Sequence, residues 1–393
     1  MRKIIALALA LVMVCALAAC GNPTTESSAP ASESATESSA PAESSSAEST
    51  AGEGLKIAII TTSGIDDGSF NQDNYEGILA FIADNPTCTV TDIKEPDLNK
   101  CIQAVEDVIA DYDVLVLPGF NYAACGTVAA ENPDKKIILV DSAPTDAEGN
   151  AVELDNVYSM TFKEEESGFF AGVAAALQTK TNKVAVVNGI AYPSNVNYQF
   201  GFMSGVNYAN AKYGTKAEIV ELASYAGTDV NNNNVGGNYI GSFADEATGK
   251  VVGKALIDEG CDILFVAAGS SGNGVFAAAK EAKDVYVIGC DTDQYDDGVN
   301  GDSNIVLTSA LKVMHLNVQR QLQAIVDGTF AGKNDTLGAS TDSTGYVSEA
   351  GRQQLTEDTL AKLAECYDAV KAGTIVPASN FNGHTPTDFP GLA

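Results

Sequence analysis

The side chains best suited to ligand binding gather in a polar, glycine-containing loop. It carries two adjacent carboxylates, Asp66 and Asp67, and the amide of Asn71, close to the rings of Phe70 and Tyr75. Carboxylate and amide oxygens accept hydrogen bonds, amides also donate them, and aromatic rings stack on other flat groups. This combination predicts a site for a neutral polar ligand that contains a ring.

The same side chains also have ordinary structural roles in front of a helix. Asp66, Asp67 or Asn71 can cap the amino end of the helix that follows. Phe70 is expected mainly to pack in the core, whereas Tyr75, one turn into the helix, can lean back over the loop. Ligand contacts are therefore predicted from Asp67, Asn71 and Tyr75. Asp66 and Phe70 are weaker candidates.

Three further candidates follow other apolar runs. Asp291 directly follows VYVIGC, Gly269 follows ILFVAA, and Lys312 ends the segment LTSALK. A carboxylate in such a place can accept hydrogen bonds from two neighbouring hydroxyls of a ligand, and a lysine could donate to the same group. The alternative for Lys312 is an ordinary surface or salt-bridging role. At Gly269 the glycine-rich backbone allows a main-chain contact with a ligand, and a phosphate loop is the weaker interpretation because no lysine or arginine follows.

Signatures of enzymes, metals and phosphate sites are weak. The chain has only two histidines, His315 and His384, no GxSxG, and no zinc-like spacing of cysteine and histidine. The acidic run after Asp291 hints at calcium. However, an EF-hand loop needs an oxygen ligand and then glycine where Tyr295 and Asp296 stand. We therefore expect no metal, no cofactor and no catalytic residue.

The amino terminus is typical of an exported lipoprotein. Arg2 and Lys3 precede an apolar stretch, residues 4–17, that is too short to span a bilayer comfortably. The stretch ends in LAAC, which resembles a bacterial lipobox. Residues 1–19 are therefore predicted to be a lipoprotein signal peptide, with Cys20 as the lipidated residue. An uncleaved anchor, or an ordinary signal peptide with a chance cysteine, is the alternative.

A flexible acidic tether is predicted to follow the lipidated cysteine. Residues 20–54 consist mainly of Ser, Ala, Glu, Thr and Pro and lack the apolar residues that form a core. About 33 such residues reach on the order of 30 Å. The formal net charge of −30 argues against a nucleic-acid partner and against docking on anionic lipid through a basic face. We expect the protein on the extracytoplasmic face of the cell membrane, held by its lipid.

The body of the chain alternates strand-like and helix-like patterns. Runs rich in β-branched residues fit strands buried on both faces, and segments of helical periodicity separate them. Two such series in tandem predict two parallel sheets, each covered by helices on both faces. The expected strands are 56–60, 89–93, 113–117, 136–140, 157–162, 184–187, 217–222, 263–266 and 285–289. The expected helices are 72–83, 98–110, 123–131, 164–179, 198–212, 245–259, 274–282, one ending near 327, and 357–372.

The cysteines of the body carry no CxxC motif. Several stand in apolar runs, so buried free thiols are expected, although a disulfide is possible outside the cytoplasm and spacing does not select a pairing. The six residues concerned are Cys88, Cys101, Cys125, Cys261, Cys290 and Cys366.

Several segments, in order along the body, resemble one protein family. Residues 64–72, GIDDGSFNQ, with YEG at 75–77, are similar to the GI-DD-x-SFNQ-xxx-(W/Y)-EG loop of the basic membrane protein (BMP, or PnrA-like) family. Other similar segments are NPDKK before a strand that ends in Asp141, FKEEE with FFAG, Tyr198 with GF and GV, YIGSF, AGSSG, VIGCDTDQ and LTSALK. The family comprises the substrate-binding lipoproteins of nucleoside ABC importers.

This resemblance implies a fold and a function. The fold is α/β, with two doubly wound parallel-sheet lobes joined by a hinge, the type I periplasmic-binding-protein architecture. The expected N-terminal lobe is 55–159 plus 295–345, and the C-terminal lobe is 160–294 plus 346–393. The implied function is capture of a nucleoside, preferably a purine nucleoside, between the lobes by a monomer that delivers it to ABC permease subunits. Alternatives are a nucleoside hydrolase on the same scaffold, a sugar-binding protein or a receptor-coupled sensor.

The resemblance also assigns roles to individual residues. In the family, two rings clamp the base, and the matching positions here are Tyr75 (or Phe70) and Tyr198, where tyrosine replaces the usual phenylalanine. An aspartate and a lysine hold the ribose, and the matching residues are Asp291 and Lys312. Stacking on a ring contributes on the order of 1–3 kcal/mol per base and tolerates different bases.

Overall fold

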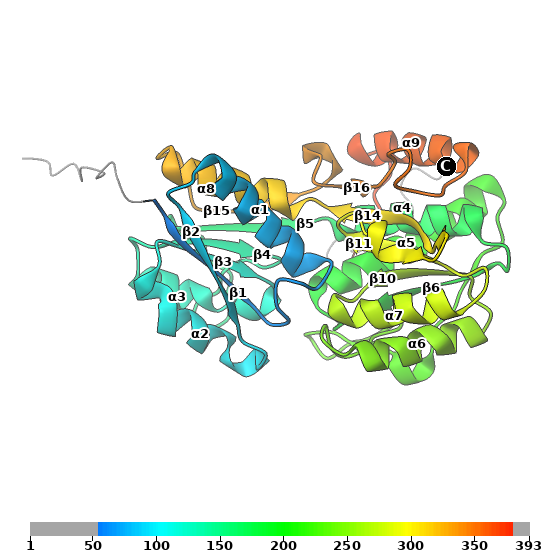
Figure 1. Cartoon of the computed structure of the whole chain (residues 1–393), viewed down its shortest axis with the longest axis horizontal. Coiled ribbons are helices and arrows are strands. Elements are labelled where there is room, and N and C mark those ends of the chain that lie inside the picture. The colour runs from blue at the N-terminus through cyan, green and yellow to red at the C-terminus, as the bar shows by residue number, and fades with distance from the viewer. Residues whose placement is uncertain (1–53, 380–393) are drawn as a thin grey trace, which may run out of the picture. The chain divides into compact units, whose positions relative to one another are not determined.

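The computed structural model describes residues 54–379, which form two lobes built on two six-stranded sheets (Figure 1). The predicted signal peptide, Cys20 and the tether up to residue 53 lie outside the described residues, as do residues 380–393. Within the described part, no helix is long and apolar enough to cross a membrane.

The first lobe is a parallel sheet between two pairs of helices. Its strand order is β15-β5-β4-β3-β1-β2. The strands are β1 (Lys56–Thr61), β2 (Thr89–Lys94), β3 (Val114–Pro118), β4 (Lys136–Val140), β5 (Val157–Phe162) and β15 (Lys333–Leu337). The helices are α1 (Phe70–Asp84) and α8 (Met314–Val326) on one face, and α2 (Cys101–Val108) and α3 (Cys125–Glu131) on the other.

Strand β1 shows why the sequence has continuous apolar runs instead of alternation. Ile57 and Ile59 pack into the core beneath α1 and α8, whereas Ala58 and Ile60 pack beneath α2 and α3. All four side chains are fully buried. Because both faces of a parallel sheet are covered by helices, every position of a central strand must be apolar.

The second lobe repeats this arrangement. Its strand order is β16-β14-β11-β10-β6-β7, parallel throughout except for the antiparallel edge strand β16. The strands are β6 (Lys183–Asn188), β7 (Glu218–Ile219), β10 (Ile263–Ala267), β11 (Tyr286–Asp291), β14 (Val306–Lys312) and β16 (Thr344–Tyr346). Two small hairpins pair β8 (Gly227–Thr228) with β9 (Asn234–Gly236), and β12 (Val299–Asn300) with β13 (Ser303–Asn304).

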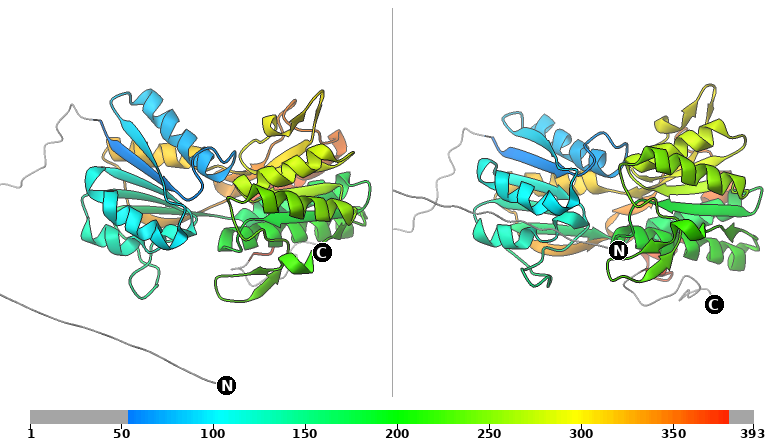
Figure 2. Two further views of the ribbon diagram at one scale, coloured as in Figure 1. Left: turned by 60° about the horizontal axis from the view of Figure 1, so that its bottom comes forward. Right: turned by 90° about the horizontal axis from the view of Figure 1, so that it is seen from below.

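Five helices cover the second sheet. On one face lie α4 (Glu164–Gln178), α5 (Pro193–Tyr213) and α9 (Glu357–Lys371), and on the other lie α6 (Glu246–Asp258) and α7 (Ser270–Glu281). The views in Figures 1 and 2 agree on this layering. Helices α4 and α5 approach so closely that a Cβ atom added at Gly172 would come within 2.1 Å of the carbonyl oxygen of Phe202.

Within residues 54–379, three crossovers connect the lobes: β5 to α4, β14 to α8, and β15 to β16. The crossover positions differ from those expected. The sequence predicts residues 295–312 in the first lobe, but β14 pairs with β11 and β16 in the second sheet. The segment that approaches α8 is itself a buried strand, and the chain returns to the first lobe only after Lys312. By strand pairing, the first lobe is 55–162 plus 313–337, and the second is 163–312 plus 338–379.

Several helices begin earlier than expected from the sequence. Helix α1 begins at Phe70 instead of residue 72, and α5 begins at Pro193 instead of residue 198. Proline is well suited to the first position of a helix, since its missing N–H has no partner there. The expected strand at 217–222 is reduced to β7, a two-residue edge strand. The six cysteines of the body are free and buried, as expected.

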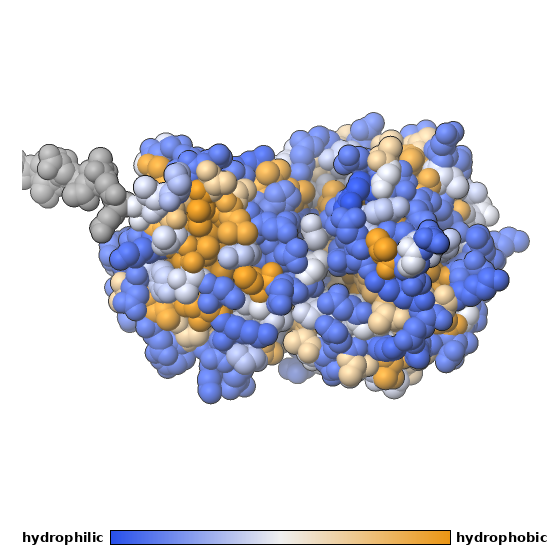
Figure 3. Space-filling model, viewed as in Figure 1, coloured by the Kyte–Doolittle hydropathy of each residue, from blue (hydrophilic) through white to orange (hydrophobic). Residues whose placement is uncertain are grey.

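The surface is mostly hydrophilic, in keeping with the acidic composition. Figure 3 shows an apolar area over the first lobe, in the region of α1 and β2. Large apolar side chains that are more than one-third exposed in that lobe include Leu79, at 44%, and Leu98, at 42%. The first lobe therefore offers the larger apolar surface in this view.

Candidate ligand-binding site

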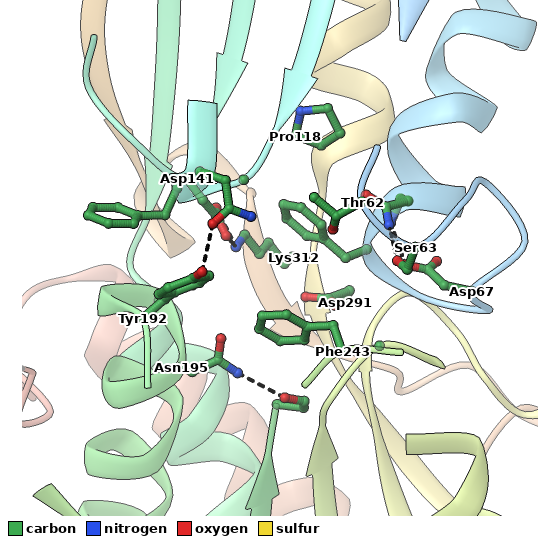
Figure 4. A pocket seen from close by; sticks show the side chains of 18 of the residues that line it. Thr62, Ser63, Asp67, Pro118, Asp141, Tyr192, Asn195, Phe243, Asp291 and Lys312 are labelled. Carbon is green, nitrogen blue, oxygen red and sulfur yellow. Dashed lines mark hydrogen bonds and ion pairs between the residues drawn. The ribbon is translucent and has the colours of Figure 1, made fainter. Parts of the chain in front are cut away.

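A cavity lies between the two lobes, at the carboxyl ends of strands from both sheets (Figure 4). Its empty space, including the mouth, is about 620 Å³. The walls come from the loops after β1, β3 and β4 in the first lobe and after β6, β10, β11 and β14 in the second. Ligands of open α/β sheets bind at these strand ends.

The structure brings most of the predicted site residues together. The residues that line the cavity are Asp67, Phe70, Asn71, Tyr198, Gly269, Asp291 and Lys312. Asp66 is exposed on the loop, and Tyr75 packs against the core of the first lobe. Because α1 begins at Phe70, Tyr75 lies roughly 140° around the helix from that ring and points away from the cavity. Phe70, the weaker candidate, takes its place in the wall.

Asp67 organises the loop that carries these residues. Its carboxylate accepts hydrogen bonds from the backbone N–H groups of Ser69, Asn71 and Gln72, at 3.0–3.1 Å. It therefore satisfies N–H groups at the amino end of α1 that would otherwise lack partners. The capping role considered for this carboxylate is present, and Asp67 also lines the cavity.

Lys312 is a buried charge and not an ordinary surface lysine. Its side chain is 1% exposed, and its Nζ lies 2.5 Å from the carboxylate of Asp141 and 3.0 Å from Oε1 of Glu164. The ammonium also lies 5.0 Å from the ring centroid of Phe70 and 5.2 Å from that of Phe162. The lysine ends β14, Glu164 begins α4, and Asp141 follows β4. This ion cluster therefore joins both lobes at two of the crossovers.

The charges of the cluster shift one another's protonation. Burial raises the pKa of Asp141 to about 7. The charge of Lys312 lowers this pKa and only partly offsets the effect of burial, while the nearby charge of Glu164 raises it further. Burial alone would lower the pKa of Lys312, but Asp141, Glu164 and Asp291 raise it above its ordinary value. The lysine is therefore protonated, and the carboxyl groups of Asp141, Glu164 and Asp291 surround this one ammonium group.

Asp291 lies at the centre of the cavity and contacts both lobes. Its Oδ1 accepts a hydrogen bond from the Tyr198 hydroxyl at 2.9 Å, and its Oδ2 accepts one from the Ser69 hydroxyl at 2.6 Å. Tyr198 belongs to α5 in the second lobe, and Ser69 precedes α1 in the first. A carboxylate has about four lone-pair sites, so Asp291 retains acceptor capacity for a ligand.

The rings that stand open to the cavity differ from those expected. The ring of Tyr198 is buried at 3% exposure and packs edge-on against Phe265, so it forms the floor of the cavity. The half-buried rings in the wall are Phe70 and Phe120 from the first lobe and Tyr192 and Phe243 from the second. Rings from both lobes therefore line the cavity.

The sequence interpretation missed many lining residues. They are Thr62, Ser63, Pro118, Gly119, Phe120, Asn121, Asp141, Tyr192, Ser194, Asn195, Phe243 and Ala267. Asp141 had the same signal as Asp291, since it directly follows the apolar run KKIILV. Phe120 and Tyr192 also lie just after strands. Phe243 has no such signal, because its loop is ordered by contacts far away in the sequence.

The described part of the chain offers no cluster of three or more His, Cys, Asp or Glu side chains that could hold a metal ion. Asp293 and Asp296, the acidic residues that hinted at calcium, instead pair with Arg352 at 2.6 Å and 2.9 Å. These side chains are thus engaged in ion pairs.

Solved structures share the fold. A solute-binding protein of an ABC transporter system from Aeropyrum pernix K1 has a TM-score of 0.70 and 22% identity, covering 84% of this chain and 94% of its own. A carbohydrate transporter solute-binding protein from Agrobacterium radiobacter, in complex with D-arabinose, has a TM-score of 0.53 and 18% identity, covering 79% of this chain and 98% of its own. At these identities the likeness concerns the fold alone, and it confirms the predicted two-lobe architecture.

Sequence relatives are more informative. The "CD4+ T-cell-stimulating antigen" of Listeria monocytogenes serovar 1/2a is 31% identical over 340 residues, covering 81% of this chain and 87% of the relative. The "ABC transporter nucleoside-binding protein BmpA" of Lactococcus lactis subsp. cremoris is 31% identical over 296 residues, covering 71% of this chain and 77% of the relative. The family described as "ABC transporter substrate-binding protein PnrA-like" matches residues 55–224 and 223–371. The chain therefore belongs to the PnrA-like (Bmp) family of ABC transporter substrate-binding proteins.

Proposed function

We propose that this substrate-binding protein captures a nucleoside between its lobes and delivers it to the permease of an ABC importer. Family membership makes it a binding protein rather than an enzyme, with a ligand and permease subunits as its partners. The nucleoside is the finer part of the proposal. It is supported by the chemistry of the cavity and by similarity to a relative named as nucleoside-binding.

The arrangement of Asp291 and Lys312 carries the proposal. Among the described residues, Asp141 and Glu164 accept two of the three N–H donors of Lys312, which leaves one for a ligand. Asp291 offers further lone pairs nearby, and Figure 4 shows both side chains directed into the cavity. A vicinal diol donates two hydroxyl protons and also offers acceptor oxygens. It therefore complements an ionised acceptor beside an ammonium donor.

The aromatic and amide side chains of the wall suit a base. Phe70 and Phe243 come from different lobes, and closure of the lobes would place a planar group among rings. The amides of Asn71 and Asn121 line the same cavity and keep an N–H group that can donate to a ligand. Both N–H groups of Asn195 already donate to Asn188 and to the carbonyl oxygen of Ala267, so its amide oxygen can only accept. A free sugar would leave this aromatic surface without a partner. The rings favour a nucleoside over a sugar, and the larger purine would gain more stacking area.

The amino-terminal sequence supports a membrane anchor. We propose that Cys20 is lipidated and that the protein acts as a monomer on the extracytoplasmic face, where the lipid keeps it near the permease. The substitution Cys20→Ala should release the protein from the membrane fraction when membranes are separated by centrifugation. Retention of this variant in the membrane fraction would contradict lipidation at Cys20.

Titration calorimetry tests the ligand. The panel is inosine, guanosine, adenosine, cytidine, uridine and ribose, and purine nucleosides are expected to bind most tightly. Asp291→Ala should abolish binding with the fold intact by circular dichroism. Asp335→Ala is the control, because Asp335 accepts a hydrogen bond from Tyr158 within the first lobe and does not line the cavity. Binding of ribose without any nucleoside would overturn the proposal, and wild-type affinity of Asp291→Ala would remove Asp291 from the site.

A further inference from the structure

A hydrogen bond spans the two lobes at the wall of the cavity. The hydroxyl of Tyr192, which precedes α5 in the second lobe, donates to Oδ1 of Asn121 in the first lobe at 2.6 Å. Asn121 belongs to the short 3₁₀ helix Phe120–Tyr122 that follows β3. Figure 4 shows this bond as a dashed line from Tyr192 toward the other lobe. The bond can exist only while the lobes are close together.

Aromatic packing supports the bond on both sides. The ring of Tyr192 lies 5.3 Å from the ring centroid of Phe120 in the first lobe and 6.0 Å from that of Phe243 in its own lobe. All these residues line the cavity. Tilted aromatic contacts at such distances are favourable, so Tyr192 is oriented toward Asn121 by its neighbours.

A second set of cross-lobe bonds involves the loop before α1. The Ser69 hydroxyl donates to Asp291, and Nε2 of Gln294 donates to the carbonyl oxygen of Gly68 at 3.0 Å. Those bonds use the loop after β1, whereas Tyr192 and Asn121 use the loops after β6 and β3. A bound ligand is therefore enclosed by cross-lobe bonds from two separate pairs of loops.

We propose that Tyr192 and Asn121 form a latch that retains the bound ligand and sets its rate of release. The two residues act by holding the lobes together, independently of any contact that they make with the ligand. The identity of the ligand rests on the proposed function, but the latch itself rests on the cross-lobe bond. Opening of the cleft requires this bond to break, so the bond stabilises the closed state relative to the open one.

The size of the effect follows from the chemistry of the bond. Both partners are neutral, and a neutral hydrogen bond changes an equilibrium by roughly two- to tenfold. The contribution belongs to the closed state, so its loss should appear mainly in the dissociation rate. Tyr192→Phe removes the hydroxyl and keeps the ring contacts. Asn121→Ala removes the acceptor from the other lobe.

The experiment measures dissociation of a tritiated nucleoside from the full-length protein during a chase with unlabelled nucleoside. Tyr192→Phe and Asn121→Ala should each raise the dissociation rate two- to tenfold, with the association rate changed less than twofold. The double variant should be no faster than the faster single variant, because either substitution removes the same bond. Tyr158→Phe is the control, since it removes a hydroxyl that bonds to Asp335 inside the first lobe. Unchanged dissociation, or effects that multiply in the double variant, would overturn the latch.

A second measurement separates the latch from the ligand. Small-angle X-ray scattering of the ligand-free protein should show a larger radius of gyration for Tyr192→Phe than for Tyr158→Phe, because loss of the bond favours the open state. If wild-type protein binds no nucleoside in the calorimetric panel, the proposed function fails and this comparison still tests the latch. Equal radii for the two variants would refute it.

Discussion

Replacement of Lys312 by methionine tests how much the ammonium group of the buried ion cluster contributes to the stability of the fold. Methionine has a similar length and no charge, so the substitution removes the ammonium with little change in packing volume. The side chain is 1% exposed, and its Nζ lies 2.5 Å from Asp141 and 3.0 Å from Glu164. These carboxylates would be left buried without a cation. The expected result is a large loss of stability, together with loss of ligand binding.

The magnitude follows from the cost of an uncompensated buried charge. Removal of one partner from a buried ion pair typically costs about 3–5 kcal/mol. This is a large part of the ~5–15 kcal/mol that stabilises an ordinary folded domain. Protonation can relieve the cost, because the pKa of Asp141 is already about 7 with the lysine present and must rise further without it. The loss should therefore be smaller at about pH 5, where Asp141 is protonated, than at about pH 8.

Urea unfolding at these two pH values, followed by circular dichroism, measures the effect. Lys312→Met with Asp141→Asn should recover part of the stability at about pH 8, because one unpaired charge is removed. Lys283→Met is the matched control, since that side chain is 92% exposed and should change stability by less than about 0.5 kcal/mol. If Lys312→Met loses less than about 1 kcal/mol at about pH 8, or loses the same amount at both pH values, the cluster does not carry the charges inferred here.

Three further predictions concern the buried start of α4, the loop before α1 and the hydroxyl of Tyr198. Burial raises the pKa of Glu165 to about 8, so wild-type stability should fall as pH rises from about 4 to about 8. Glu165→Gln should remove that loss in urea titrations, and equal stabilities of the two proteins at high pH would contradict it. Asp67→Ala removes the acceptor of three backbone N–H groups and should lower stability by about 1–2 kcal/mol in thermal unfolding. Asp66→Ala should be nearly neutral, and equal losses for the two would refute the capping role. Tyr198→Phe removes the hydroxyl that bonds to Asp291 and should weaken nucleoside binding by up to tenfold in calorimetry. Unchanged affinity would show that this bond does not position the carboxylate.

The sequence was informative wherever a local pattern determines the structure. Continuous apolar runs predicted the central strands, because a strand covered on both faces has no polar side. Polar residues in the loops after such runs, Asp67 and Asp291 among them, line the cavity in the structure. Parallel topology places all strand carboxyl ends at one edge, so these residues could be expected to meet although they are far apart in the chain.

Other features depend on contacts that a local pattern does not contain. Phe70 lines the cavity and Tyr75 does not, because the packing of the buried face of α1 sets the orientation of the helix, and a local pattern does not contain that packing. The crossover was misplaced because β14 is followed at once by α8, and only its pairing with β11 shows which sheet it joins. Glu164 stood in a matched motif without an assigned role, since its partner Lys312 lies in a distant strand.

The repeated architecture explains why one lysine is surrounded by carboxylates. Strands β4 and β11 occupy equivalent third positions in the two sheets. Asp141 follows the first and Asp291 ends the second, and both have left-handed φ angles, 65° and 70°. Each lobe therefore directs an aspartate to the same edge, and Lys312 enters between them from the second crossover. The cluster lies at two of the crossovers, so a ligand bound to Asp291, as proposed above, would contact the group of side chains that joins the two lobes.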